Sequence, residues 1–139
     1  MPKQIASLLL LMLLSVIGQA QPKLSTKNKK AIVFYQSAIK AYDKYEYDTA
    51  EKELELAVDK DKNFIEAYLL MAQVYQETRR YEQAIEVSEK AIAINPDFFP
   101  NIYLNVGNLN LFLGRYQRAL EHLTRFISYP NIRPNLREK

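Results

Sequence analysis

The sequence predicts an all-α solenoid of six helices, arranged as three helix-turn-helix units. The main observation is an internal repeat: similar segments begin at Tyr47, Tyr81 and Tyr116, at spacings of 34 and 35 residues. In each segment an alanine follows the tyrosine by three residues, and a small residue precedes it by nine. The second observation is that the 139-residue chain has only three glycines, which disfavours phosphate-binding loops and sheets with tight turns. Such a period is typical of helical hairpins that stack to bury a shared core.

Residues 1–20 differ from the rest of the chain. Lys3 supplies a positive charge, residues 5–17 form a largely apolar run, and small residues follow at Gly18 and Ala20. This pattern predicts a secretory signal peptide that is cleaved after Ala20. The alternative is an uncleaved membrane anchor, but a spanning helix needs about 20 apolar residues and this run is shorter. No cysteine follows the run, so a bacterial lipoprotein anchor is excluded.

The remaining chain is divided by composition and by the repeat. Residues 21–28 are polar and are predicted to be a linker. The repeats follow over residues 29–133. The predicted units span residues 31–64, 65–98 and 100–133, with approximate boundaries. Residues 134–139 are predicted to be a tail or the start of a truncated capping helix.

Each unit has apolar residues at helical spacing in both of its helices. The recurring positions of the first helices hold Phe34, Ala38 and Ala41, then Tyr68, Met71, Ala72 and Tyr75, then Tyr103, Val106 and Gly107. Those of the second helices hold Ala50 and Ala57, then Ala84 and Ala91, then Ala119 and Phe126. Small residues should let the two helices of a unit approach closely, while aromatic residues fill the space between units. Gly114 is expected to cap the helix that ends near Phe112.

In its period and in these positions the chain resembles the tetratricopeptide-repeat family, over residues 29–133. The resemblance implies a right-handed solenoid in which the first helix of each unit lines a concave groove. A signal peptide that ends in Ala-Gln before such repeats is also similar to the N-terminal region of Bacteroidetes OmpA-type envelope proteins. In those proteins the repeats precede a β-propeller and a peptidoglycan-binding domain, neither of which is present in this chain.

Residues that could carry chemistry are few. The chain has no cysteine and a single histidine, His122, so neither a catalytic thiolate nor a zinc site is expected. The glutamates within residues 51–55 fit a solvated helix face, and Arg79 and Arg80 fit a solvated turn. A net charge of +3 is too small to indicate a nucleic-acid surface. We therefore expect no enzymatic activity, no cofactor, no metal ion and no nucleic-acid partner.

The candidate partner-binding residues lie in the first helices. Asn101, Asn105 and Asn108 share one helix face because they are spaced by four and three residues, although asparagine is a poor helix former. The predicted groove comprises Tyr35, Ile39, Tyr42, Leu69, Gln73, Gln76, Asn101, Leu104, Asn105, Asn108 and Leu111. A side-chain amide offers two donors and two acceptor lone pairs, so it can pair with a peptide backbone of any sequence. The apolar neighbours would supply pockets for side chains.

Other interpretations of the asparagines stay open. Asn101 would cap its helix while the others only face solvent, or asparagines would pair between helices, as expected for Asn110. Some family members grip a C-terminal carboxylate with lysine and arginine in the groove. The matching positions here carry neither residue, so the resemblance does not imply that mode of recognition.

The expected function is a non-enzymatic scaffold that binds a protein or peptide segment in the groove, in the periplasm or outside the cell. The alternative is a structural piece of a cell-envelope assembly, such as gliding or secretion machinery, with the solenoid packed against another domain or subunit. The last helix would show Leu123, Phe126 or Ile127 on its outer face, where a solenoid needs a polar cap. Either the tail covers this face, or a partner covers it by self-association or docking, or the chain is one piece of a longer protein; the last two are favoured. After signal cleavage no membrane-length apolar segment remains.

Overall fold

The computed structural model describes residues 23–132, and every regular element in this range is helical. The elements are α2 (Lys29–Asp43), α3 (Tyr47–Lys60), α4 (Ile65–Glu77), α5 (Tyr81–Ile94), α6 (Asn101–Phe112), α7 (Tyr116–Ile127) and the short 3-10 helix η1 (Pro130–Ile132). The predicted signal peptide and the predicted tail lie outside the described residues. Among these helices, none combines the length and the apolar character that a bilayer span requires.

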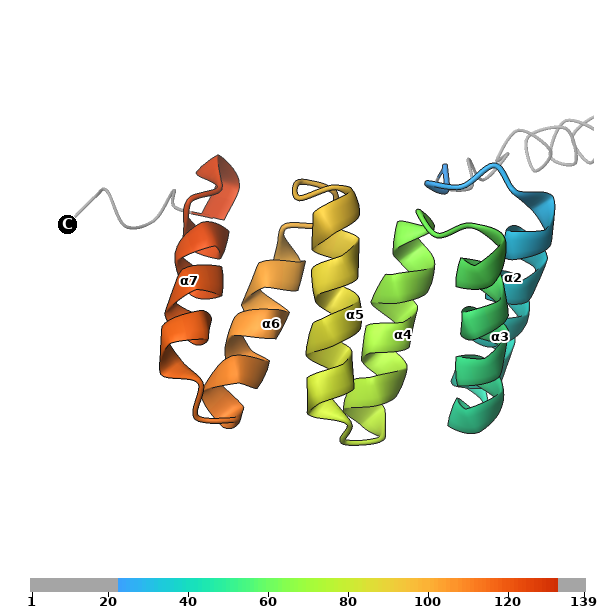
Figure 1. Cartoon of the computed structure of the whole chain (residues 1–139), viewed down its shortest axis with the longest axis horizontal. Helices are drawn as coiled ribbons and strands as arrows, with labels where there is room; N and C mark the ends of the chain where they lie inside the picture. The colour runs from blue at the N-terminus through green and yellow to red at the C-terminus, as the bar shows by residue number, and fades with distance from the viewer. Residues whose placement is uncertain (1–22, 133–139) are drawn as a thin grey trace, which may run out of the picture.

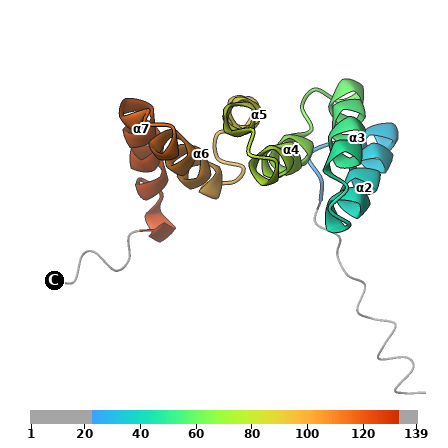
Figure 2. The same ribbon diagram turned by 90° about the horizontal axis from the view of Figure 1, so that it is seen from below.

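The six α-helices form three antiparallel hairpins that stand in a row (Figure 1). A view turned by 90° shows α2, α4 and α6 in one layer and α3, α5 and α7 in the other (Figure 2). We call the solvent-exposed side of α2, α4 and α6 the first-helix face. The prediction of an all-α solenoid with three helix-turn-helix units is confirmed.

One type of turn closes all three hairpins. The residue after each C-cap has a left-handed backbone: Tyr45 with φ 62°, Arg79 with φ 59° and Gly114 with φ 71°. The N–H of the following residue then donates to a carbonyl five residues back, as Arg80 does to Tyr75 at 2.7 Å. This pattern is the Schellman motif, whose left-handed position favours glycine. The predicted cap at Gly114 is confirmed, and the other two turns carry a side chain at the same position.

Small residues set the distance between the helices of a hairpin. Ala38, Ala84 and Ala119 are fully buried. A Cβ placed on Gly107 would lie 2.7 Å from the Cγ of Leu123 on the facing helix, which is closer than carbon atoms pack. The prediction that small residues permit close approach is therefore confirmed.

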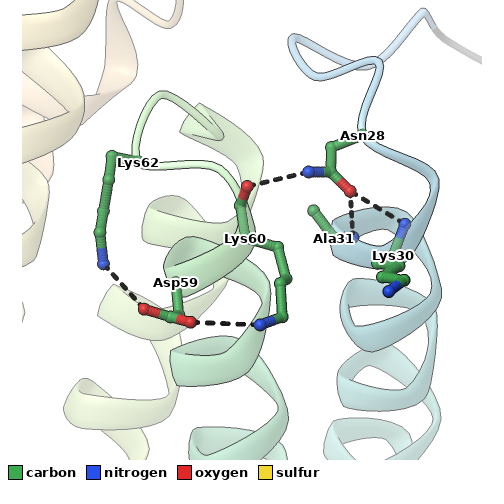
Figure 3. Close-up of polar contacts among 6 residues, drawn as sticks. All are labelled: Asn28, Lys30, Ala31, Asp59, Lys60 and Lys62. Atoms are coloured by element: carbon green, nitrogen blue, oxygen red, sulfur yellow. Dashed lines mark hydrogen bonds and ion pairs between the residues drawn. The ribbon is translucent and has the colours of Figure 1, made fainter.

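The segment predicted as a linker is packed against the repeats. Asn28 is the N-cap of α2, and its Oδ1 accepts hydrogen bonds from the N–H groups of Lys30 and Ala31 (Figure 3). Its Nδ2 donates to the carbonyl of Lys60 at 2.9 Å, which joins the start of α2 to the end of α3. Residues 23–28 thus have no regular secondary structure, but their polar groups bond to distant parts of the fold.

Helix α7 ends the row and leaves an apolar side uncovered. Tyr116 is 72% exposed, Leu120 60% and Ile127 41%. The expected uncovered face is present, but only Ile127 of the three predicted residues belongs to it. Leu123 and Phe126 are half-buried, and Leu123 instead faces α6.

Candidate partner-binding surface

The asparagines of α6 divide into an exposed group and a buried residue. Asn101, Asn105 and Asn108 are exposed residues of α6, so they belong to the first-helix face. Asn110 is completely buried, and its Nδ2 donates to the carbonyl of Val106 at 2.9 Å. The expectation that Asn110 pairs between helices was wrong, because this bond is to its own helix. Within the described range its Oδ1 has no hydrogen-bond partner.

The capping interpretation of Asn101 does not hold. Pro100 occupies the N-cap position of α6, and no side chain caps this helix. Asn101 is already inside the first turn. The three exposed asparagines therefore present their amides outward, next to the half-buried Leu104 and the exposed Leu111.

The predicted residues of α4 continue this surface only in part. Gln73 is exposed and Leu69 is half-buried. Gln76 is half-buried, and its Nε2 donates to the carbonyl of Ala72 at 3.3 Å on the same helix. Of the two, only Gln73 is exposed, so α4 adds one exposed amide beside α6.

The predicted residues of α2 are mostly packing residues. The ring of Tyr35 lies 4.9 Å from that of Phe64, and burial raises the pKa of the Tyr35 hydroxyl. The ring of Tyr42 lies 5.7 Å from that of Tyr47, and Ile39 is half-buried. The structure thus places all predicted residues in one helix layer, while the outward-facing amides gather on α4 and α6.

An ion pair that sequence reasoning missed joins the first two units. Arg80 donates to both carboxylate oxygens of Glu51, at 2.9 and 2.7 Å. Its guanidinium also lies over the ring of Tyr75, 4.6 Å from the centroid. The hydrogen bond from Arg80 holds the pKa of the Glu51 carboxyl below its usual value. Burial, followed by the charge of Glu51, raises the pKa of Tyr75 to about 12. Interpreting Arg80 and Glu51 as solvated was wrong.

Two larger hollows lie away from the predicted groove. One of about 390 Å³ is lined by Glu55, Val58, Lys62, Tyr68, Met71, Tyr75, Gln83, Glu86, Val87 and Lys90. Another of about 440 Å³ is lined by Lys29, Lys30, Val33, Phe34 and Lys60 at the N-terminal end of the row. No predicted groove residue lines either hollow. The sequence gives no signal for them, because each is lined by residues of more than one helix that are far apart in the chain.

A polar cluster ties the last helix to the preceding loop. Arg125 donates to Asp97 at 2.9 Å, and the hydroxyl of Tyr129 donates to the same carboxylate at 2.6 Å. The guanidinium of Arg125 also lies 5.0 Å from the centroid of the Tyr129 ring. His122 contacts the carbonyl of Arg118 through Nδ1 at 2.8 Å. In residues 23–132 no group of three potential metal ligands is found.

Solved structures of similar fold exist at low sequence identity. The structure of MamA has a TM-score of 0.69 and 22% identity, with 73% of this chain and 59% of that chain covered. The first TPR of Spaghetti (RPAP3), solved with the HSP90 peptide SRMEEVD, has a TM-score of 0.68 and 20% identity, with 79% and 84% covered. At these identities the likeness establishes the fold alone.

Sequence comparison gives the family. The curated relative BBSome complex member BBS4 of Bos taurus is 26% identical over 118 residues. That match covers 74% of this chain and 22% of the relative, so this chain spans less than a quarter of the relative's length. Residues 43–126, more than half of the chain, match the model of the family described as anaphase-promoting complex, cyclosome, subunit 3. The chain therefore belongs to this family of tetratricopeptide-repeat proteins.

Proposed function

We propose that this protein is a non-enzymatic interaction module that binds an extended segment of a partner protein on the first-helix face. The observation that carries the proposal is the exposed row of Asn101, Asn105 and Asn108 on α6. Three asparagines lower the helix propensity of a 12-residue helix, and none of the three caps it. The peptide bound to the similar Spaghetti domain supports this type of function.

The surface is suited to binding the peptide backbone of a partner rather than its charged groups. Amides of Asn105, Asn108 and Gln73 can donate to peptide carbonyls and accept from peptide N–H groups. Leu69 and Leu104 are half-buried beside them and offer apolar contacts for alternate side chains. No lysine or arginine belongs to the predicted groove, so we propose recognition without a carboxylate clamp.

The test is selection from a peptide library on the full chain, followed by affinity measurements. The Asn105→Ala, Asn108→Ala double variant should lose at least about tenfold in affinity for the selected peptides. The matched control is Gln117→Ala, Thr124→Ala, which removes two exposed neutral side chains from α7 in the other layer. Equal binding by both variants, or no enrichment of any peptide, overturns the proposal. Far-UV circular dichroism verifies that both variants keep the helicity of the wild type.

A second candidate function is docking through α7 to another domain or subunit, as in a cell-envelope assembly. Leu120 is 60% exposed, whereas Ile85 at the equivalent position of α5 is 3% exposed. Tyr81 of α5 is covered by Phe112 of α6, with ring centroids 5.0 Å apart, while the equivalent Tyr116 is 72% exposed. The uncovered side of α7 thus corresponds to the side of α5 that is packed against α6.

Self-association through α7 is tested by analytical ultracentrifugation. A wild-type chain that dimerises, with Leu120→Glu monomeric and equally helical, supports docking. A wild type that stays monomeric at several hundred micromolar rules out self-association and leaves a different subunit as the partner.

We also propose that the protein acts outside the cytoplasm. The support is the apolar run over residues 5–17, followed by small residues at Gly18 and Ala20. Cell fractionation with N-terminal sequencing should find the chain outside the cytoplasm, beginning at Gln21. An intact Met1 in a cytoplasmic fraction would overturn this proposal.

A further inference from the structure

The two junctions between units have the same backbone design. Asp61 ends α3 with φ −148° and ψ 104°, and Asn95 ends α5 with φ −150° and ψ 103°. The Oδ1 of Asp61 accepts a hydrogen bond from the N–H of Asn63 at 2.9 Å. The Oδ1 of Asn95 accepts one from the N–H of Asp97 at 3.1 Å. The second junction (residues 95–101) is one residue longer than the first junction (residues 61–66). Residues 61–63 therefore correspond to residues 95–97 and residues 64–66 to residues 99–101, with Phe98 as the extra residue.

The first junction is occupied by the chain's own extended segment, residues 23–28. The N–H of Ser25 donates to Glu66 at 2.9 Å, and the Ser25 hydroxyl donates to the other oxygen of that carboxylate. The Oγ of Ser25 also accepts from the N–H of Ile65 at 3.0 Å, which satisfies an unpaired group at the start of α4. The hydroxyl of Thr26 donates to Asp61. The segment is thus held by a carboxylate at each end of the junction.

Apolar contacts accompany these hydrogen bonds. Phe64 in the first junction is fully buried, with Tyr35 at its side, and Leu24 of the segment packs against the same core. In the second junction Phe99 stands at the position of Phe64 and is 42% exposed. Its neighbour Phe98 is 38% exposed. The second junction therefore leaves partly exposed the apolar side chains that correspond to the buried Phe64, although Phe98 and Phe99 line a small hollow with Ile65 and Leu69.

The polar groups of the second junction are neutral counterparts of those in the first. Asn101 stands at the position of Glu66, and Asn95 at that of Asp61. Because the Oδ1 of Asn95 is already used within the turn, its Nδ2 takes the place of the carboxylate oxygen that receives Thr26. A segment here would meet amide groups, which bind carbonyl and hydroxyl oxygens, rather than two carboxylates.

We propose that the second junction binds an extended segment of a partner protein, seated as residues 23–28 are seated on the first. The segment places an aliphatic side chain on Phe98 and Phe99, and it offers carbonyl or hydroxyl oxygens to Asn95 and Asn101. The sequence Leu-Ser-Thr, residues 24–26, is the pattern that the occupied junction displays. This inference rests on the proposed function. It places part of the bound segment on the loop between α5 and α6 and on the first residue of α6, next to the first-helix face.

The probe is the peptide acetyl-KLSTKN-amide, which copies residues 23–28 and is labelled for fluorescence anisotropy with the full chain. Saturable binding is expected. Because residues 23–28 already occupy the first junction of the same molecule, the peptide should bind at the second junction. Phe99→Ser should weaken that binding at least about tenfold. The control peptide KASTKN, which lacks the aliphatic side chain, should bind as weakly to the wild type. Circular dichroism checks that Phe99→Ser remains folded.

A gain of affinity gives an independent readout. The double variant Asn95→Asp, Asn101→Glu copies the two carboxylates of the first junction. It should bind KLSTKN about tenfold more tightly than the wild type, because charge-assisted hydrogen bonds are the stronger ones. No binding up to about 1 mM, or binding that ignores both Phe99→Ser and the carboxylate variant, overturns the inference. The proposed function fails separately, when library peptides ignore Asn105 and Asn108.

Discussion

Replacing Arg79 by glycine should stabilise the protein, although it removes a side chain. Arg79 has φ 59° at the left-handed position of the Schellman turn between α4 and α5. Its N–H donates to Gln76 at 3.0 Å, a bond that glycine keeps. Among residues 23–132 the Arg79 side chain has no ion pair, unlike that of Arg80. The substitution therefore removes backbone strain and little else.

The magnitude follows from two opposing terms. A side chain in the left-handed region costs about 1–2 kcal/mol, and glycine costs about 0.5–1 kcal/mol in conformational entropy on folding. Arg79→Gly should thus raise the free energy of unfolding by about 0.5–1 kcal/mol, or the melting temperature by about 2–6 °C. The reverse substitution Gly114→Ala, at φ 71° in the equivalent turn, should lower the unfolding free energy by a similar amount.

Urea unfolding followed by circular dichroism measures both changes. Glu77→Gly is the matched control, because it places glycine two residues earlier, at the last residue of α4. That control should destabilise the protein by up to about 1 kcal/mol, the cost of glycine in a helix interior. If Arg79→Gly lowers the urea midpoint as Glu77→Gly does, the left-handed strain is not stored in this turn and the reasoning is refuted.

Four further substitutions test three other contacts. Glu51→Gln should lower the free energy of unfolding by about 1 kcal/mol at neutral pH. Since Arg80 lowers the folded pKa of Glu51, this stabilisation is present above the unfolded pKa near 4.5 and is lost as the pH falls through the folded pKa. Wild type and variant should therefore have the same stability in urea titrations at acid pH. Ser25→Ala should cost about 1 kcal/mol, as loss of a cap does, and should speed hydrogen exchange at the start of α4; unchanged exchange there contradicts the contact. Gly107→Val should cost about 1–3 kcal/mol by overpacking, and Leu123→Ala in the same chain should recover part of it; additive costs in a double-mutant cycle would show that the two sites do not touch.

The fold was predictable because the residues that determine helix packing recur at the same positions in each unit. A spacing of 34 to 35 residues, with a small residue before and after each tyrosine, specifies where two helices meet. Gly107 shows the reason, since no side chain fits against Leu123. Gly114 likewise identified its turn, because glycine tolerates the left-handed backbone. Tyr45 and Arg79 adopt the same backbone and gave no such signal, since the turn is imposed on them by the hairpin.

The contacts that were missed join residues far apart in the sequence. Ser25 and Glu66 are separated by 41 residues, and Glu51 and Arg80 by 29. Each residue alone is a polar group in a loop or on a helix, which is also how a solvated group looks. The exposed asparagines were found because they oppose local helix propensity. Phe99 was not singled out, because only comparison with the buried Phe64 shows that it lacks a cover.

The segment formed by residues 23–28 affects the order in which the units of the solenoid unfold. In a linear array each unit is held only by its neighbours, yet this segment adds bonds from the start of unit one to Asp61, at the end of α3, and to Glu66, at the start of unit two. The Arg80–Glu51 pair strengthens the same boundary. Within residues 23–132 no comparable segment bonds the third unit to the second, and the Arg115–Glu82 ion pair between them is exposed. The amides of the third unit should therefore exchange with solvent first, through openings that leave α2 to α5 folded. Helix α6, which carries the exposed asparagines, should then open more readily than α2 to α5. A partner that binds α6 would therefore also suppress this local unfolding.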